Sequence, residues 1–134
     1  MTLSLDTNVL VRLLTRDHIE QYNATLGLVA TAIETGQSVV VLPGVILETE
    51  WVLRSRYKLC ANEIQKTFSA ILETIGVDVH EPQILEEALR MWRDNAGADF
   101  ADCMHVAASV HLGGTLATFD QGAARLPGAM LIAL

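Results

Sequence analysis

The motif Leu3-Ser4-Leu5-Asp6-Thr7-Asn8-Val9-Leu10 joins a short apolar run to an acid and then to an apolar helix pattern. Apolar residues recur at helical spacing as far as Arg16, so we predict a strand over Leu3–Leu5 and a helix over Asn8–Arg16. An apolar strand that leads directly into a helix is typical of a parallel sheet covered by helices. This first pair of elements therefore predicts an α/β fold.

The same alternation continues along the chain. Further strands are predicted at Ser38–Leu42, Val77–Val79, Thr115–Thr118 and Ala129–Ile132. Helices are predicted at about Glu20–Glu34, Pro43–Tyr57, Ala61–Thr74, Pro82–Asp94 and Asp99–Leu112. Because there is no repeat and no linker-like segment, we expect residues 1–134 to form a single domain. The expected fold class is a three-layer α/β/α sandwich around a short parallel sheet of roughly four to five strands.

Composition and charge exclude several classes of protein. Hydrophobic residues make up 51% of the chain, which argues against intrinsic disorder. The net charge of −7 argues against nucleic-acid binding through a broad basic face, but it is compatible with an acidic metal site. No apolar run reaches the ~20 residues that span a bilayer, and no signal peptide is apparent, so we expect a cytoplasmic protein without membrane contact. Cys60 and Cys103 lie in apolar contexts and predict buried thiols.

Acidic residues gather at the ends of the predicted strands. Asp6 follows the first strand, Asp120 follows the fourth, and Glu48 lies about one turn into the helix after the second. Asp99 and Asp102 begin the helix before the fourth strand and share one helix face. Because ligands of parallel α/β sheets bind at the carboxyl ends of the strands, all of these acids are expected to converge. Hard oxygen ligands of this kind suit Mg²⁺ or Mn²⁺, which would also neutralise the clustered carboxylates.

Helix capping is the alternative role for several of these acids. Asp6, Asp99 and Asp120 each precede a predicted helix, and Asp is a preferred N-cap residue. Taken singly, each is more simply interpreted as a cap. Glu48 alone would fit an exposed helix acid, and Glu50 is interpreted in that way. The joint placement of the acids at one edge of the sheet favours the metal site.

Other phosphate-handling folds lack their defining residues here. A phosphatase of the haloacid dehalogenase type needs a second acid two positions after Asp6, where this chain has Asn8. A response-regulator receiver needs a late lysine, whereas the only lysines are Lys58 and Lys66. A P-loop or dinucleotide-binding fold needs a glycine-rich first turn, which is absent. These absences argue against other metal-dependent phosphotransfer enzymes.

The acids occur in four separated segments, Leu5-Asp6-Thr7-Asn8-Val9-Leu10, Leu47-Glu48-x-x-Trp51-Val52-Leu53, Ala98-Asp99-Phe100-Ala101-Asp102 and Thr118-Phe119-Asp120. These segments resemble the four acidic motifs of the PIN domain. Their order and spacing are kept from Leu3 to about Pro127, and the whole chain resembles the VapC toxins of bacterial toxin–antitoxin pairs. The resemblance implies an α/β/α fold around a short parallel sheet, in agreement with the fold class predicted above.

The resemblance also implies the residues of the site. The acids implied to bind the metal and act in catalysis are Asp6, Glu48, Asp102 and Asp120. Asp99 is implied as a further metal ligand. The polar residues implied to support the site through hydrogen bonds are Asn8 and Thr118. Candidate contacts for RNA phosphates are Arg12, Arg54 and Arg56, although each taken singly is more simply a solvated charge.

The implied activity is a Mg²⁺- or Mn²⁺-dependent endoribonuclease. Divalent ions held by carboxylates polarise a phosphoryl oxygen and activate water, which leaves 5′-phosphate and 3′-hydroxyl ends. The resemblance further implies a homodimer and a cognate VapB-type antitoxin that occludes the site. The alternative is a metal-binding PIN interaction module that does not cleave RNA. Trp51 and Trp92 are predicted to lie in the core or in an interface, because neither lies in a basic, aromatic-rich pattern typical of base stacking.

Overall fold

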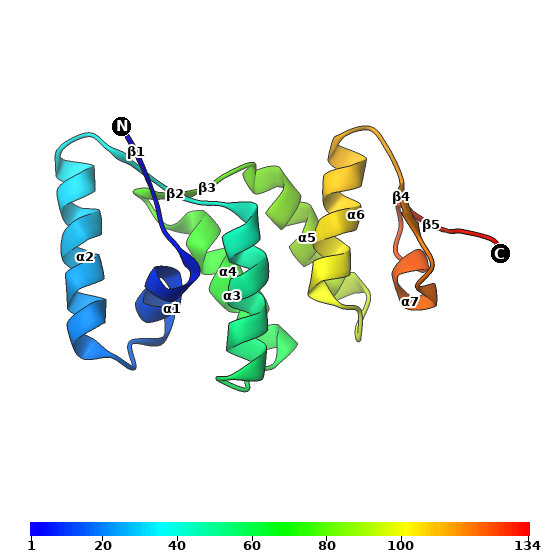
Figure 1. Ribbon diagram of the computed structural model, residues 1–134, viewed down its shortest axis with the longest axis horizontal. Helices are drawn as coiled ribbons and strands as arrows, with labels where there is room; N and C mark the ends of the chain where they lie inside the picture. The colour runs from blue at the N-terminus through cyan, green and yellow to red at the C-terminus, as the bar shows by residue number, and fades with distance from the viewer. The chain divides into compact units, whose positions relative to one another are not determined.

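The computed structural model describes residues 1–134, which divide into two compact units, Met1–His80 (unit 1) and Glu81–Leu134 (unit 2). Figure 1 labels the helices and strands in chain order. The predicted α/β class is confirmed, because every strand pairs in parallel and one or two helices lie between successive strands along the chain. None of the helices is both long enough and apolar enough to cross a membrane.

Unit 1 contains a parallel three-stranded sheet in the order β1-β2-β3. The strands are β1 (Thr2–Ser4), β2 (Ser38–Val41) and β3 (Val77–Val79). In the register, Val39 lies opposite Leu3 on one side and opposite Val77 on the other. Val39 and Val41 of the central strand are fully buried, as expected for a strand between two neighbours.

Four helices surround this sheet: α1 (Thr7–Thr15), α2 (Ile19–Glu34), α3 (Pro43–Ser55) and α4 (Ala61–Glu73). Helix α1 packs against α2 and α3, α2 also contacts β2, and α4 contacts β3. Pro43 occupies the first turn of α3, where its missing N–H has no cost. Because α1 and α3 begin directly after the paired strands β1 and β2, their N-terminal ends lie at the same edge of the sheet.

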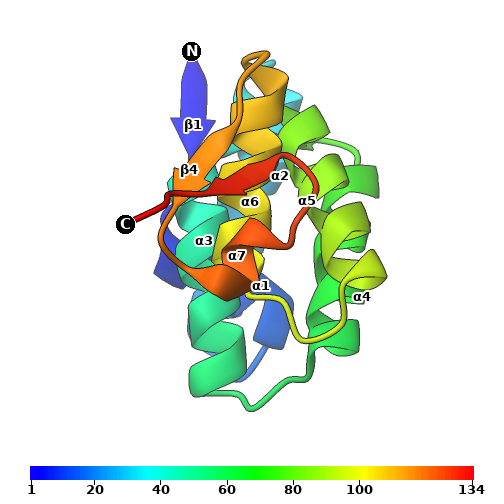
Figure 2. The same ribbon diagram turned by 90° about the vertical axis from the view of Figure 1, so that its right-hand side faces the viewer.

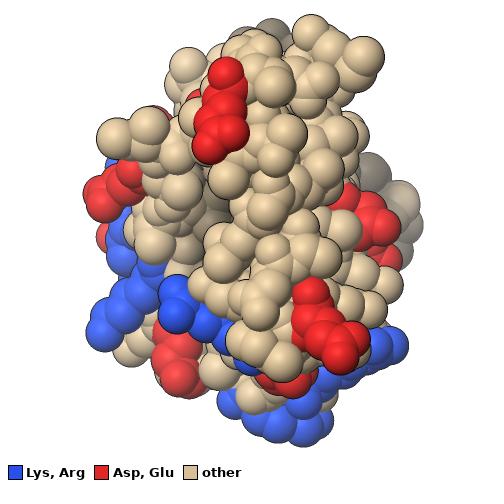
Figure 3. All heavy atoms as spheres, turned by 90° about the vertical axis from the view of Figure 1, so that its left-hand side faces the viewer, with Lys and Arg blue, Asp and Glu red and all other residues tan.

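Helix α2 presents an uncharged surface. No charged residue occurs between Glu20 and Glu34, and Figure 3 shows a broad uncharged area on the side of the molecule where α2 lies. The large apolar side chains of α2 that remain exposed are Ile19, Leu26, Leu28 and Ile33. Several exposed apolar side chains on one uncharged helix are typical of a protein interface.

Unit 2 contains two longer helices and a small sheet (Figure 2). Its elements are α5 (Pro82–Asp94), α6 (Phe100–His111), β4 (Leu116–Thr118), α7 (Gln121–Ala124) and β5 (Ala129–Leu131). Helices α5 and α6 pack together, and the rings of Trp92 and Phe100 lie 4.9 Å apart. The indole N–H of Trp92 donates to the carbonyl of Ala98 at 3.0 Å, so this buried ring has its polar group satisfied.

The small sheet of unit 2 is held close to α6. Strands β4 and β5 pair in parallel, with Leu116 opposite Ala129. Gly128, just before β5, has a φ of +106°, and a Cβ there would lie 2.6 Å from Cγ2 of Val110. Only glycine therefore allows the chain to approach the helix at this point. The short helix α7 was not predicted. The predicted strands are divided between two sheets, one in each unit.

The prediction of buried thiols is confirmed for Cys103 and wrong for Cys60. Cys60 is exposed because it is the N-cap residue of α4, where its backbone N–H donates to Oε1 of Glu63 at 3.0 Å. Cys103 is fully buried in α6. Its burial, and then the negative charges of Asp102 and Asp99, raise the pKa of the Cys103 thiol to about 11.

The two cysteines should therefore differ sharply in reactivity. We expect a thiol reagent at neutral pH to modify Cys60 rapidly, and Cys103 only after unfolding, because the thiolate is the reactive form. The measurement is the number of thiols modified in the native and the denatured protein. In the control variant Cys60→Ser, rapid native modification should disappear; if it persists, the assignment of the reactive thiol is wrong.

Candidate metal centre

In unit 1, the acids Asp6 and Glu48 line one pocket of about 420 Å³. Asp6 directly precedes α1, and Glu48 lies in the second turn of α3, so both belong to the sheet edge where these helices begin. Both side chains are exposed. Asn8, Trp51 and Arg56 also line this pocket. The structure thus brings together two acids that are far apart in the sequence.

A hydrogen bond from Thr7 holds Glu48 in place. The hydroxyl of Thr7, which is buried, donates to Oε1 of Glu48. Asn8, the residue implied for this supporting role, lines the pocket but makes no side-chain hydrogen bond to either acid. Sequence reasoning missed Thr7, although Thr7 lies inside the quoted first motif. Thr7 and Asn8 are both polar, and only the packing of α1 on α3 distinguishes them.

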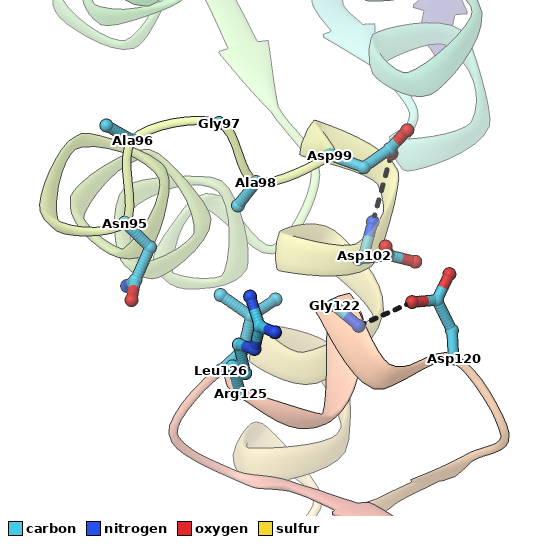
Figure 4. Close-up of a pocket in the computed structure, with 10 residues that line it drawn as sticks. All are labelled: Asn95, Ala96, Gly97, Ala98, Asp99, Asp102, Asp120, Gly122, Arg125 and Leu126. Atoms are coloured by element: carbon cyan, nitrogen blue, oxygen red, sulfur yellow. Dashed lines mark hydrogen bonds between the residues drawn. The ribbon is translucent and has the colours of Figure 1, made fainter.

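In unit 2, Asp99, Asp102 and Asp120 line a second pocket, of about 390 Å³. Asp99 precedes α6, Asp102 lies in its first turn, and Asp120 precedes α7. Figure 4 shows the carboxylates of Asp102 and Asp120 turned toward one another, with Asp99 beside the start of the same helix. Arg125, which sequence reasoning did not single out, also lines this pocket (Figure 4).

Burial and the neighbouring carboxylates together change the titration of Asp102. Partial burial raises its pKa above the ordinary value, and the negative charges of Asp99 and Asp120 raise it further. The positive charge of His105 opposes this shift only in part. The folded protein therefore disfavours the charged form of Asp102, and a cation bound nearby would reverse that preference.

Three of the acids cap helices, and each does so with one oxygen only. Oδ1 of Asp6 accepts from the N–H of Val9 at 2.9 Å, Oδ1 of Asp99 from Ala101 at 2.8 Å, and Oδ1 of Asp120 from Gly122 at 2.7 Å. In each of them Oδ2 accepts no hydrogen bond from the protein. Capping and metal ligation are therefore compatible in the same side chain.

Thr118 supports the second pocket through the backbone. Its hydroxyl accepts a hydrogen bond from the N–H of Asp120 at 3.0 Å, which holds the turn that carries this acid. Asp102 and Glu48, in contrast, cap no helix. For these two residues, the capping alternative raised by the sequence does not apply.

The donor atoms in both pockets are carboxylate oxygens, which suit a hard divalent cation such as Mg²⁺ or Mn²⁺. In neither unit do three or more Asp, Glu, His or Cys side chains lie close enough together to hold an ion by themselves. Each unit thus offers a partial set of ligands. The convergence of all five acids stays a prediction.

Arg12, a candidate RNA contact, is engaged within unit 1. Its guanidinium lies 3.2 Å from Oδ1 of Asp17 and donates to Gln21 at 2.6 Å and to the hydroxyl of Tyr57 at 3.3 Å. The hydroxyl of Tyr57 also donates to Asp17, and this bond, together with those from Thr15 and Arg12, lowers the pKa of Asp17. Arg12 therefore connects the end of α1 with the segments that follow α1 and α3.

The other two candidate arginines differ from each other. Arg54 forms an ion pair of 2.8 Å with Glu50, one helical turn before it. Glu50 is only 3% exposed, so its interpretation as a surface acid is wrong. The guanidinium of Arg56 makes no hydrogen bond or ion pair, and the residue lines the pocket of Asp6 and Glu48. Arg56 is thus the best placed of the three to bind an anion.

The arrangement of acids can be compared with known families. A family model described as the PIN domain matches residues 3–129. The chain belongs to the PIN domain family. This confirms the predicted PIN resemblance, and the members of this family are generally metal-dependent nucleases. The match spans both units of this PIN domain and includes all five acids.

This PIN domain is similar to a chain in the crystal structure of VapBC2 from Rickettsia felis bound to a DNA fragment from their promoter. The sequence identity is 16%, the similarity covers 98% of both chains, and the TM-score is 0.39. A comparison with curated proteins finds no match.

Proposed function

We propose that this PIN domain is a divalent-metal-dependent endoribonuclease that acts as the cytoplasmic toxin of a bacterial toxin–antitoxin pair. The observation that carries the proposal is the set of carboxylates with uncommitted oxygens in the two pockets. The proposed catalytic acids are Asp6, Glu48, Asp102 and Asp120, with Asp99 as a further metal ligand. Activity is proposed to require the acids of both units.

The bound Mg²⁺ or Mn²⁺ would polarise the scissile phosphodiester and activate the water that hydrolyses it. The protein's contribution is to orient the carboxylates and to receive the RNA. Thr7 orients Glu48 through its hydroxyl, and Thr118 holds the turn of Asp120. The free guanidinium of Arg56 offers a contact for a phosphate beside the acids. The net charge of −7 opposes the approach of RNA, and a bound cation would offset part of this charge at the acids.

We also propose that the protein forms a homodimer and is inhibited by a cognate VapB-type antitoxin. The four quoted motifs support this part of the proposal through their resemblance to VapC toxins. The exposed apolar side chains of α2 support a protein partner, because such surface is seldom left uncovered. The proposed antitoxin would cover the acids and so prevent access of RNA.

The test is cleavage of total RNA by the purified protein with Mn²⁺ or Mg²⁺, and with excess EDTA. We expect discrete fragments with 5′-phosphate and 3′-hydroxyl ends, and no fragments in EDTA, because metal-assisted hydrolysis leaves these ends. The ends are identified by ligation and sequencing before and after phosphatase treatment. Full cleavage in EDTA would contradict the metal mechanism. Metal binding without cleavage of any RNA would favour the alternative, a PIN interaction module.

A further inference from the structure

Trp51 is an exposed tryptophan beside the acids of unit 1. Its relative exposure is 51%, and it lines the pocket that contains Asp6 and Glu48. The protein's other tryptophan, Trp92, is 6% exposed and has its indole N–H satisfied, as predicted for a core residue. Tryptophan is highly buried on average, so an exposed ring in a polar pocket calls for a functional explanation.

The residues of α3 that line this pocket lie in a regular order along the helix. Trp51 follows Glu48 by three residues and so shares its face. With a rise of 1.5 Å per residue, Trp51 lies about 4.5 Å beyond Glu48 along the helix axis, and Arg56, the C-cap residue just after α3, lies about 12 Å beyond Glu48. The pocket therefore offers an acid, an aromatic ring and an unpaired cation in succession.

We propose that this pocket is a nucleotide subsite, in which Trp51 stacks on an RNA base and Arg56 binds a backbone phosphate. The inference rests on the proposed function and assigns two residues of this chain to the binding of its RNA substrate. An aromatic ring can stack on any unpaired base, whereas the bases of a duplex are not accessible to it. The guanidinium of Arg56 suits a phosphate, and Asp6 and Glu48 would hold the cation at the bond that is cleaved.

The composition of the pocket favours RNA over a protein partner. The succession of carboxylates, ring and guanidinium matches the cation, base and phosphate of a nucleotide. The only other side chains that line the pocket are Thr7, Asn8, Val45 and Val52, so it lacks the continuous apolar floor that a helix of a partner would need. The subsite would not read sequence by itself, because stacking tolerates every base.

Steady-state kinetics on a short single-stranded RNA of mixed sequence test the assignment. We expect Trp51→Ala to raise KM roughly 5- to 150-fold, the range that corresponds to the loss of one base–aromatic stack, with kcat nearly unchanged. Trp51→Phe should restore most of the affinity, because it keeps an aromatic ring. The control is Ile75→Ala, which removes an apolar side chain that is 96% exposed outside the pocket and should leave KM unchanged.

A second measurement needs no cleavage. Acrylamide should quench the fluorescence of Trp51 but hardly that of buried Trp92, and single-stranded RNA added in EDTA should shield Trp51 from the quencher. The same RNA as a duplex should not shield it. Thermal melts of all variants verify that each is folded before it is assayed.

Either of two results would overturn the subsite. The first is an unchanged KM in Trp51→Ala; if inhibition by the cognate antitoxin is lost in the same variant, the ring belongs to a protein interface. The second is unchanged quenching at saturating RNA. If the wild-type protein cleaves no RNA, the proposed function is contradicted instead. Shielding of Trp51 would still decide whether RNA binds in this pocket.

Discussion

Asp6→Asn should abolish RNA cleavage while the protein stays folded. The amide of Asn accepts the same hydrogen bond from the N–H of Val9, which Asp6 accepts at 2.9 Å, so the cap of α1 is kept. The negative charge offered to the cation is lost. Because even residues that only orient metal ligands contribute roughly 10- to 100-fold, we expect the rate to fall by at least ~100-fold. The measurement is the initial rate on total RNA with Mn²⁺, beside a thermal melt.

Two further variants separate the roles of this side chain. Asp6→Ala should also lose the cap and cost ~0.5–2 kcal/mol of stability, with or without metal. Asp78→Asn makes the same chemical change at an exposed acid of β3 outside the pocket, and it should leave the rate unchanged. If Asp6→Asn cleaves RNA at the wild-type rate, Asp6 is a helix cap and nothing more.

Asp102→Asn should make the metal-free protein more stable and remove most of its stabilisation by Mn²⁺. Asp102 caps no helix, and it lies beside Asp99 and Asp120, whose negative charges His105 offsets only in part. Removing its charge therefore relieves repulsion in the apo protein. The wild type should gain ~2.7 kcal/mol at a hundredfold excess of Mn²⁺ over the dissociation constant. Thermal melts of both proteins, in EDTA and in Mn²⁺, give the comparison.

The same pair of proteins should show a defined pH dependence. Because the pKa of Asp102 is raised in the folded state, the folded protein holds this proton more tightly than the unfolded chain does. Its contribution to stability is therefore unfavourable above the raised pKa and disappears as the pH falls below the ordinary value of 3.8. The advantage of Asp102→Asn in EDTA should accordingly shrink toward acidic pH.

The control for Asp102 is Asp94→Asn, an exposed acid of the same unit that lies outside the pocket. This variant should keep the full response to Mn²⁺. Equal Mn²⁺ shifts in the wild type and in Asp102→Asn would show that Asp102 is not a metal ligand.

Local sequence patterns were sufficient to predict most of the helices and strands. The β-branched run in β2 and the proline at the start of α3 predicted these elements to within a few residues. The capping roles of Asp6, Asp99 and Asp120 were also predictable, because a cap depends only on residues two or three positions away. The short helix α7 escaped prediction, since a helix of four residues has no apolar periodicity to detect.

The sequence by itself determined the α/β class, the order of the elements and the identity of the acids, because these depend on spacing and on neighbouring residues. Only the tertiary structure decided which face of each helix is buried against the rest of the protein. In α3, Glu50 is buried and Trp51 is exposed, the reverse of what their polarity suggests. Thr7 bonds to Glu48, and Arg12 bonds to Tyr57, across 41 and 45 residues of sequence. Helical spacing shows which residues share a face, but segments distant in the sequence determine which face they cover.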